Sequence, residues 1–422
     1  MRPSARYELG LVVLLFLTWG TVFLDRMSLL YLAPFIAPDL HLSHTQVGLL
    51  VSALALAWAI SGLILGAVSD RIGRRPVLLP AVFAFSVLSW LSGIVTSFGE
   101  LFTVRVLMGF AEGPTWSTIT ATVEESSAPE RRGRNVGVVV SAAALVGLAL
   151  APVLTTQIAA RVGWRGAFFV AGMPGILLGL LLWKFVREPI RDQPAAIHPK
   201  PSWKEYFTLL RQRNILLCCS AAAGFMTWLF VMNAFAPLYL TEVSRNSATF
   251  AGLILGASGL GAFLWGWILP WLSDSTGRKP ALLFVALISA AVPLTYQVPF
   301  LVSHPWLLAI AGFVANGGQG IAALALVLIP TESVPPEFAA TAIGLTTLIG
   351  EIFGGTLAPA MAGGVADRYG LAAPLWIAAA GAVTVFCAGL FLRETAPRKL
   401  TPTIAGRRGE RNHQPRTAIN GD

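Results

Sequence analysis

Two pairs of charged residues lie inside stretches whose composition is otherwise that of membrane spans. Asp25 and Arg26 are adjacent within "LTWGTVFLDRMSLLYLAPFIAP". Arg105 and Glu112 occur within "LFTVRVLMGFAEGPTWS". A charged side chain at the centre of a bilayer costs about 3 kcal/mol or more, so such residues are generally paired or functional. These four residues are therefore the first candidates for chemistry.

Depth along the helices places the four charges in one layer. Asp25 lies roughly 21 to 24 Å into its span, at about 1.5 Å per residue. Arg105 and Glu112 lie roughly 6 and 16 Å from the opposite edge. Arg105 and Glu112 are two helical turns apart, so they share a helix face but cannot pair directly. We expect Asp25 to bridge to Arg105.

The four charges have two interpretations. A closed charge network would only fasten two helices together, although buried ion pairs are a costly way to gain stability. Alternatively, an arginine in a low-dielectric cavity presents a planar fork that matches a carboxylate. The protonation of a neighbouring acid then responds to whatever binds that arginine. Such a group can move an organic anion together with protons.

Composition identifies the elements that must hold these residues. The chain has 422 residues, of which 55% are hydrophobic and 12% charged, and this balance indicates an integral membrane protein. Apolar runs of about 20 residues recur, which indicates membrane-spanning helices and not a barrel. The expected spans are residues 9–37, 46–68, 77–96, 101–123, 135–159, 165–186, 214–240, 248–270, 281–300, 305–330, 339–362 and 371–392.

The 30 lysine and arginine residues indicate the orientation. If both termini lie on one side, that side carries 24 of these residues. The opposite side carries Arg161, Arg165, Arg245 and Arg368, and Arg26 and Arg105 lie inside spans. The positive-inside rule then predicts cytoplasmic termini and a multi-pass protein of the cell (inner or plasma) membrane.

Two motifs recur in the second part of the chain. "SDRIGRRP" at 69–76 matches "SDSTGRKP" at 273–280, and "ESSAPE" at 125–130 matches "ESVPPE" at 332–337. Parallel repeats of this kind are typical of transporters, with the substrate site between the halves. The expected fold is an all-α membrane protein of twelve transmembrane helices in two pseudo-symmetric bundles. The expected parts are an N-terminal bundle at 1–189, a cytoplasmic linker at 190–212, a C-terminal bundle at 213–396 and a disordered basic cytoplasmic tail at 397–422.

The repeat predicts an asymmetric site. At an offset of 207, Glu112 corresponds to Gln319 and Arg105 to Gly312, so these charges have no copies. Proton coupling is therefore expected in the first half and neutral contacts in the second. The candidate neutral contacts are Asn233, Asn316 and Gln319. A further acid, Glu351, is a third titrating group, a partner for Arg26 or a structural residue.

The segment "GAVSDRIGRRPVL", residues 66–78, resembles the loop signature of the major facilitator superfamily. The resemblance covers about residues 9–395 and implies the major facilitator fold. It also implies a charge latch, shared with the basic loop after the fourth helix, that holds one access state closed. The candidate latch residues are Gly66, Asp70, Arg71, Gly73, Arg74, Arg75, Arg134, Asp274 and Arg278. The second copy lacks an arginine directly after its aspartate. Whether the second half forms a matching latch is therefore an open question.

The motif "LDR" in the first helix, and an arginine followed seven residues later by a glutamate in the fourth, resemble the anion:cation symporter branch. That branch includes sugar-acid and aromatic-acid permeases. The resemblance implies that Asp25 and Glu112 couple protons. It also implies that Arg26 anchors the carboxylate and Arg105 couples the acids to the cavity. The expected function is import of a sugar acid, aromatic acid or similar monocarboxylate with protons, by alternating access.

Other functions fit the sequence less well. "GLALAPVL" is a fragment of the motif that marks drug antiporters, so the alternative is a proton-coupled exporter of an amphiphilic small molecule. No phosphate loop, paired metal ligands or nucleophile with a histidine indicates an enzyme. His41 and His44 are spaced for metal but lack nearby acidic partners in sequence, so a solvated outer loop is expected. We expect no metal, no cofactor except protons, no nucleic acid partner, contact with membrane lipid, and a monomer.

Overall fold

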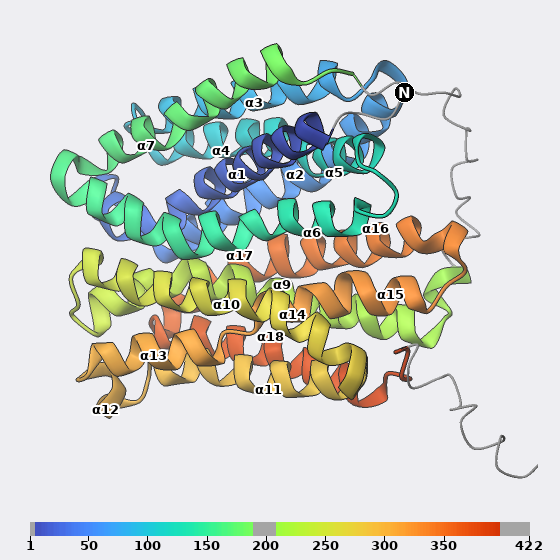
Figure 1. Ribbon diagram of the computed structural model, residues 1–422. Coiled ribbons are helices and arrows are strands. Elements are labelled where there is room, and N and C mark those ends of the chain that lie inside the picture. The colour runs from blue at the N-terminus through green and yellow to red at the C-terminus, as the bar shows by residue number, and fades with distance from the viewer. Residues whose placement is uncertain (1–4, 189–207, 397–422) are drawn as a thin grey trace, which may run out of the picture.

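The computed structural model describes residues 5–188 and 208–396 (Figure 1). Its long helices run side by side and form two bundles, one stacked on the other. The described ends of the chain lie at the same end of the molecule, on the right in Figure 1. The predicted tail, and the predicted linker apart from residues 208–212, lie outside the described residues.

The first bundle is built from helices whose apolar faces pack around a common core. Its elements are α1 Ala5–Asp39, α2 His44–Ile72, α3 Arg75–Ser92, α4 Phe98–Glu112, α5 Thr115–Ser126, α6 Arg132–Ala142, the π-helical segment η1 Ala143–Leu150 and α7 Ala151–Phe185.

The second bundle repeats this order with more interruptions. Its elements are α9 Arg213–Leu238, η2 Tyr239–Val243, α10 Ala248–Thr276, α11 Arg278–Thr295, α12 Pro299–Val302, α13 Pro305–Ala315, α14 Gly318–Ala322, η3 Ala323–Leu328, α15 Ile329–Glu332, η4 Pro336–Phe338, α16 Ala339–Gly350, η5 Glu351–Leu357, α17 Ala358–Tyr369 and α18 Ala372–Phe391.

The twelve predicted spans are all present in the described residues. Ten helices are long and apolar enough to cross a membrane. One of them, Arg132–Phe185, is 54 residues long and holds two spans, because Gly163 interrupts it with a φ of 78° and a ψ of 163°. The remaining span is the broken pair α4 and α5. The all-α fold class is therefore confirmed.

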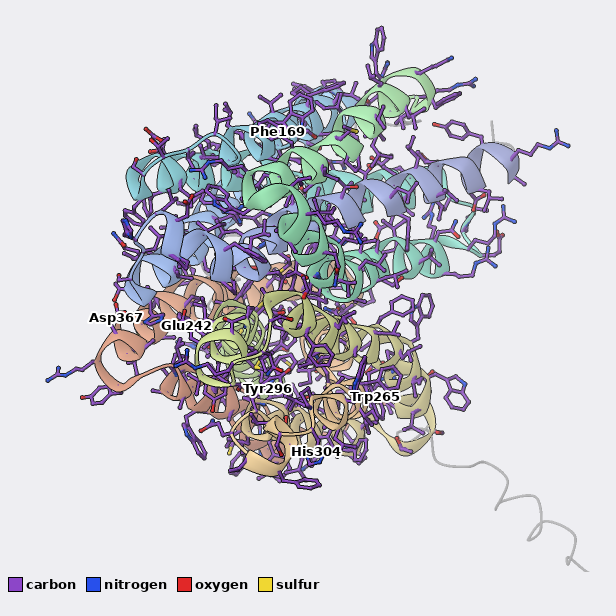
Figure 2. All side chains as sticks on the ribbon, turned by 90° about the vertical axis from the view of Figure 1, so that its left-hand side faces the viewer. Phe169, Glu242, Trp265, Tyr296, His304 and Asp367 are labelled. Carbon is purple, nitrogen blue, oxygen red and sulfur yellow. The ribbon has the colours of Figure 1, made fainter. Side chains whose placement is uncertain are left out.

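The two bundles touch at the end away from the termini. Gly48 of α2 lies against the carbonyl group of Pro359, and Gly363 of α17 lies against that of His44, so neither position has room for a side chain. Asp367 of α17 accepts hydrogen bonds from the first backbone N–H groups of α2, at 2.9 Å from the nitrogen of His44. These contacts hold the bundles together at this end, which faces the viewer in Figure 2.

Candidate functional site

The fourth span of the first bundle is broken near its middle. Pro114 has no N–H group and its ring disfavours a continuous helix, so α4 ends at Glu112 and α5 begins at Thr115. The Phe110 carbonyl group, which loses its backbone donor at Pro114, accepts instead from the Ser61 hydroxyl of α2. Gly113 lies against the carbonyl group of Trp58 on α2, where a side chain would not fit. The break therefore places Glu112 at a helix end inside the bundle.

The corresponding span of the second bundle is broken as well. Helix α13 ends at Ala315, and Asn316 adopts a non-helical ψ of 85°. The Asn316 Oδ1 accepts a hydrogen bond from the Gly318 N–H at 3.3 Å, and the Gly317 N–H donates to Ser289 Oγ at 3.1 Å. Discontinuous helices in matching positions of two repeats are typical of transporter binding sites.

Arg26 lies between the two bundles. Its side chain is 4% exposed, and its Nη2 is 3.4 Å from Oε2 of Glu351 in the second bundle. Three aromatic rings surround the guanidinium group: Phe230 at 4.9 Å, Trp58 at 5.1 Å and Phe23 at 5.9 Å from ring centroid to guanidinium carbon. Of the roles considered for Glu351, the geometry shows the pairing with Arg26.

Asp25 and Arg105 have other partners than expected. The carboxylate of Asp25 accepts a hydrogen bond from Ser89 of α3 at 2.5 Å. Arg105 donates to the backbone carbonyl group of Arg26 at 3.0 Å and to the sulfur of Met108 at 3.1 Å. The predicted direct bridge from Asp25 to Arg105 is therefore wrong for the hydrogen bonds and ion pairs we describe, because Asp25 faces α3.

Glu112 is fully buried, and neither of its carboxylate oxygens has a hydrogen-bond partner among the described residues. The second oxygen of Asp25 has no such partner either. Both acids belong to the first bundle, as do the arginines Arg26 and Arg105. An ionisable residue held inside a membrane bundle is a candidate functional group.

Neutral polar groups line a cavity beside these charges. Asn233, Asn316 and Gln319, the three predicted neutral contacts, all line one cavity of about 20 Å³, which has room for about one water molecule. The Asn233 Oδ1 accepts a hydrogen bond from Tyr31 of α1 at 2.9 Å, which crosses between the bundles. The Asn316 side chain donates to Ser258 Oγ at 2.8 Å. The structure thus brings these three residues together.

The charged layer and the cavity adjoin on α9. Phe230 packs on Arg26, and Asn233, which lines the cavity, is one helical turn further along. Tyr31 lies on α1 beyond Arg26 and bonds to Asn233. The cavity therefore has three carboxamides in its wall, and α9 and Tyr31 connect it to the surroundings of Arg26.

The loop motif of the first bundle forms a charge cluster at the end where the termini lie. Arg74 pairs with Asp70 at 2.6 Å and with Glu125 at 2.9 Å. The backbone N–H groups of Arg74 and Arg75 donate to the carboxylate of Glu188 at 2.6 and 2.9 Å. This cluster ties the loop to the ends of α5 and α7 within one bundle.

The second bundle repeats the cluster. Arg278 pairs with Asp274 at 2.7 Å and with Glu332 at 2.8 Å. The N–H groups of Arg278 and Lys279 donate to the carboxylate of Glu394 at 2.7 and 3.2 Å. Partial burial raises the pKa of Glu394, but N–H donors, led by that of Ala396, hold this pKa below its usual value overall. Arg278 thus has the same kind of partners as Arg74, whereas Ser275 stands at the position of Arg71.

The other latch candidates differ in surroundings. Gly73 has a φ of 109° and lies against Glu188, so glycine is required there on both grounds. Gly66 lies close to Ser117 of α5. Arg71 and Arg134 are exposed. The ion pairs of Arg74 and of Arg278 each join residues of one bundle, so the function of a latch stays a prediction.

Several contacts escaped the sequence interpretation. Ser89 carried no signal, because serine is common in membrane spans and this span also holds Ser86 and Ser92. Two aromatic residues also lie at the site: Trp58 packs on Arg26, and Tyr31 donates to Asn233. Trp116 instead packs on Trp19 at 5.2 Å between ring centroids, and Trp265 donates to the carbonyl group of Val314 at 2.8 Å.

The acidic partners of His44 lie far away in sequence. Its Nδ1 is 3.0 Å from Asp367, and its Nε2 is 3.5 Å from Glu242 of η2. Figure 2 shows these two acids near one another at one edge of this end. The expectation that His44 lacks acidic neighbours is therefore wrong, because the fold brings two acids from distant parts of the chain beside it. No group of three potential metal ligands occurs among the described residues.

Comparison with known proteins identifies the family. The Major Facilitator Superfamily model matches residues 14–354, so the chain belongs to this superfamily of membrane transporters. It is 31% identical over 331 residues to the hexuronate transporter of Bacillus subtilis (strain 168), which covers 76% of each chain. It is 26% identical to the probable galactarate/D-glucarate transporter of Escherichia coli (strain K12), over 84% of this chain and 85% of that one.

Solved structures agree with the fold. A bacterial homologue of the human lysosomal transporter Spinster, in an inward-facing and unoccupied conformation, matches with a TM-score of 0.73. The match has 20% sequence identity and covers 92% of this chain and 97% of that one. At this identity, the likeness concerns the fold alone.

Proposed function

We propose that this chain is a secondary active transporter that imports an organic carboxylate with protons by alternating access. The observation that carries the proposal is Arg26, a buried guanidinium group between the bundles that packs on Phe230 of α9, one helical turn before Asn233 in the cavity wall. Asp25 and Glu112 are buried in the same bundle and are the proposed proton sites. Arg105, bonded to the backbone of Arg26, would link the acids to the anion anchor.

The relatives support an anionic substrate. The two named above are described as transporters of hexuronate and of galactarate or glucarate, which are sugar acids. Three carboxamides in the cavity suit such compounds, because a carboxamide both donates to and accepts from hydroxyl groups. We therefore place sugar acids first among the substrate classes, ahead of aromatic acids.

The contacts between the bundles suggest how access alternates. The bundles meet at the end away from the termini, through Asp367 and the N-terminus of α2. If the termini are cytoplasmic, as the charge distribution favours, this is the outer end, and the conformation is closed to the outside. We propose that the protein works as a monomer in the cell membrane, surrounded by lipid, and needs no cofactor except protons.

Uptake into proteoliposomes tests this function. Purified protein is reconstituted and offered radiolabelled sugar acids, aromatic acids and short hydroxy acids, with and without an inward proton gradient. We expect at least one carboxylate to accumulate, and to do so only with the gradient. If no carboxylate enters while a cationic amphiphile is expelled, the protein is an exporter and the proposal fails.

A further inference from the structure

Glu351 is a buried acid in the bundle that otherwise gives neutral groups to the cavity. Its side chain is 4% exposed, and its Oε2 lies 3.4 Å from Nη2 of Arg26. Glu351 begins the π-helical segment η5, and Gly355, four residues later, lies against the same carboxylate where a side chain would not fit. The local backbone thus leaves room for this carboxylate beside the arginine. Single π-helical turns often occur at functional sites.

Arg26 has little space for a second anion. Phe230, Trp58 and Phe23 cover its guanidinium group, and Glu351 takes one of its terminal nitrogens. Its Nε has no hydrogen-bond partner among the described residues. A substrate carboxylate that binds Arg26 must therefore share it with Glu351 or displace Glu351, and in either case stays close to that acid.

For a second carboxylate on the substrate, the described residues offer two other strongly buried arginines, and each already has hydrogen-bond partners. Arg105 already donates to the Arg26 carbonyl group and to Met108. Arg278, the other strongly buried arginine among the described residues, is held by Asp274 and Glu332 at the far end of its bundle. Hydroxyl groups are different, because they can donate hydrogen bonds to a carboxylate.

We infer that Glu351 is a specificity-determining residue, which makes the site select monocarboxylates that carry hydroxyl groups over dicarboxylates. This inference rests on the proposed function. The substrate carboxylate binds Arg26, its hydroxyl groups donate to Glu351, and the carboxamides bind the rest. A dicarboxylate of the same skeleton brings its second charge towards Glu351 and is repelled.

Direct binding of matched acids to the purified full-length protein tests the inference. Two pairs share an open carbon chain and differ in one carboxylate: radiolabelled gluconate with glucarate, which carry hydroxyl groups, and sorbate with muconate, which carry none. In the wild type, the monocarboxylate of at least one pair should bind about tenfold more tightly than its dicarboxylate. Glu351→Gln should reduce this ratio about tenfold by improving dicarboxylate binding.

Two further variants make the result decisive. Glu351→Asp keeps the charge and should keep the preference, even if the glutamine variant folds poorly. Glu100→Gln removes an exposed acid at the start of α4 and should leave the ratio unchanged. If Glu351→Gln alters binding of both acids by the same factor, or if Glu351→Asp loses the preference, the inference is overturned. If the wild type binds none of the four acids, both the inference and the proposed function fail.

Discussion

At the residue scale, the adjacent pair Asp25 and Arg26 has two separate environments. Asp25 turns towards α3 and accepts a hydrogen bond from Ser89, while Arg26 faces the second bundle and Glu351. Neighbouring helical residues diverge by about 100°, so the two charges need not neutralise one another. This separation allows one residue to carry a proton while the other binds an anion.

Asp25→Asn should abolish proton-driven accumulation, because the amide cannot carry a proton between the two sides. Substrate exchange across the membrane should continue, since the variant keeps Arg26 and the cavity. Uptake and counterflow in proteoliposomes measure the two activities. Asp39→Asn, a neutralised acid at the exposed end of the same helix, is the control. Full accumulation by Asp25→Asn would place the coupling site elsewhere.

Arg26→Lys should weaken substrate binding by about 10- to 100-fold, since hydrogen bonds to charged groups are worth about 1.5–3 kcal/mol. Lysine keeps the charge but lacks the planar fork. The dissociation constant of the bound carboxylate is the measurement. Arg161→Lys, at an exposed position of α7, should bind normally. An unchanged dissociation constant for Arg26→Lys would exclude Arg26 as the anchor.

At the scale of the elements, the N-terminus of α2 has two caps, its own Ser43 and an acid of the other bundle. The carboxylate of Asp367 accepts from the N–H groups of His44 and Thr45, each at 2.9 Å. An anion at a helix N-terminus satisfies unpaired donors and interacts favourably with the helix dipole. The N-terminus of α2 therefore takes part in a contact between the bundles. This contact is lost whenever the bundles separate at this end.

Asp367→Ala should favour separation of the bundles at this end. Loss of a helix cap costs about 1–2 kcal/mol, which corresponds to about a 5- to 30-fold shift in population. Spin labels at His41 and Arg368, in a chain without its native cysteines, report the distance between the bundles. Glu100→Gln should leave the distance distribution unchanged. If Asp367→Ala leaves it unchanged as well, the cap does not control closure.

At the scale of the whole molecule, the two bundles share a scaffold and differ in the charges they hold. The clusters around Arg74 and Arg278 are built alike. In each, two acids pair with the arginine side chain, and a third accepts from the backbone N–H groups of the arginine and of the next residue. Glu112 and Arg105, however, correspond to Gln319 and Gly312. Repetition thus preserves the positions of the helices, while the charged site belongs mainly to one copy.

Arg74→Ala and Arg278→Ala should destabilise the protein by similar amounts, about 1–3 kcal/mol in the free energy of unfolding, because each removes the arginine that pairs with a partly buried glutamate, Glu125 or Glu332. Tryptophan fluorescence during thermal unfolding in detergent gives the comparison. Arg71→Ala, an exposed arginine of the same loop, should have little effect. Equal losses from all three variants would show that the clusters have no special role.

The helices could be predicted from the sequence because each span is an apolar run between charged loops. The breaks in the fourth and tenth spans also had signals, in "EGPTWS" and "FVANGGQG". Contacts between distant helices were harder to predict. The bond from Ser89 to Asp25 and the approach of Asp367 to His44 depend on how helices rotate and tilt against one another, which composition does not determine.

Proton movement during substrate entry tests the central claim most directly. A pH-sensitive dye is trapped inside proteoliposomes, and the monocarboxylate that binds best is added outside without a pH gradient. We predict that the lumen becomes acidic as substrate enters, and that Asp25→Asn liposomes show no acidification. Substrate entry into wild-type liposomes without any change in luminal pH would contradict proton-coupled import.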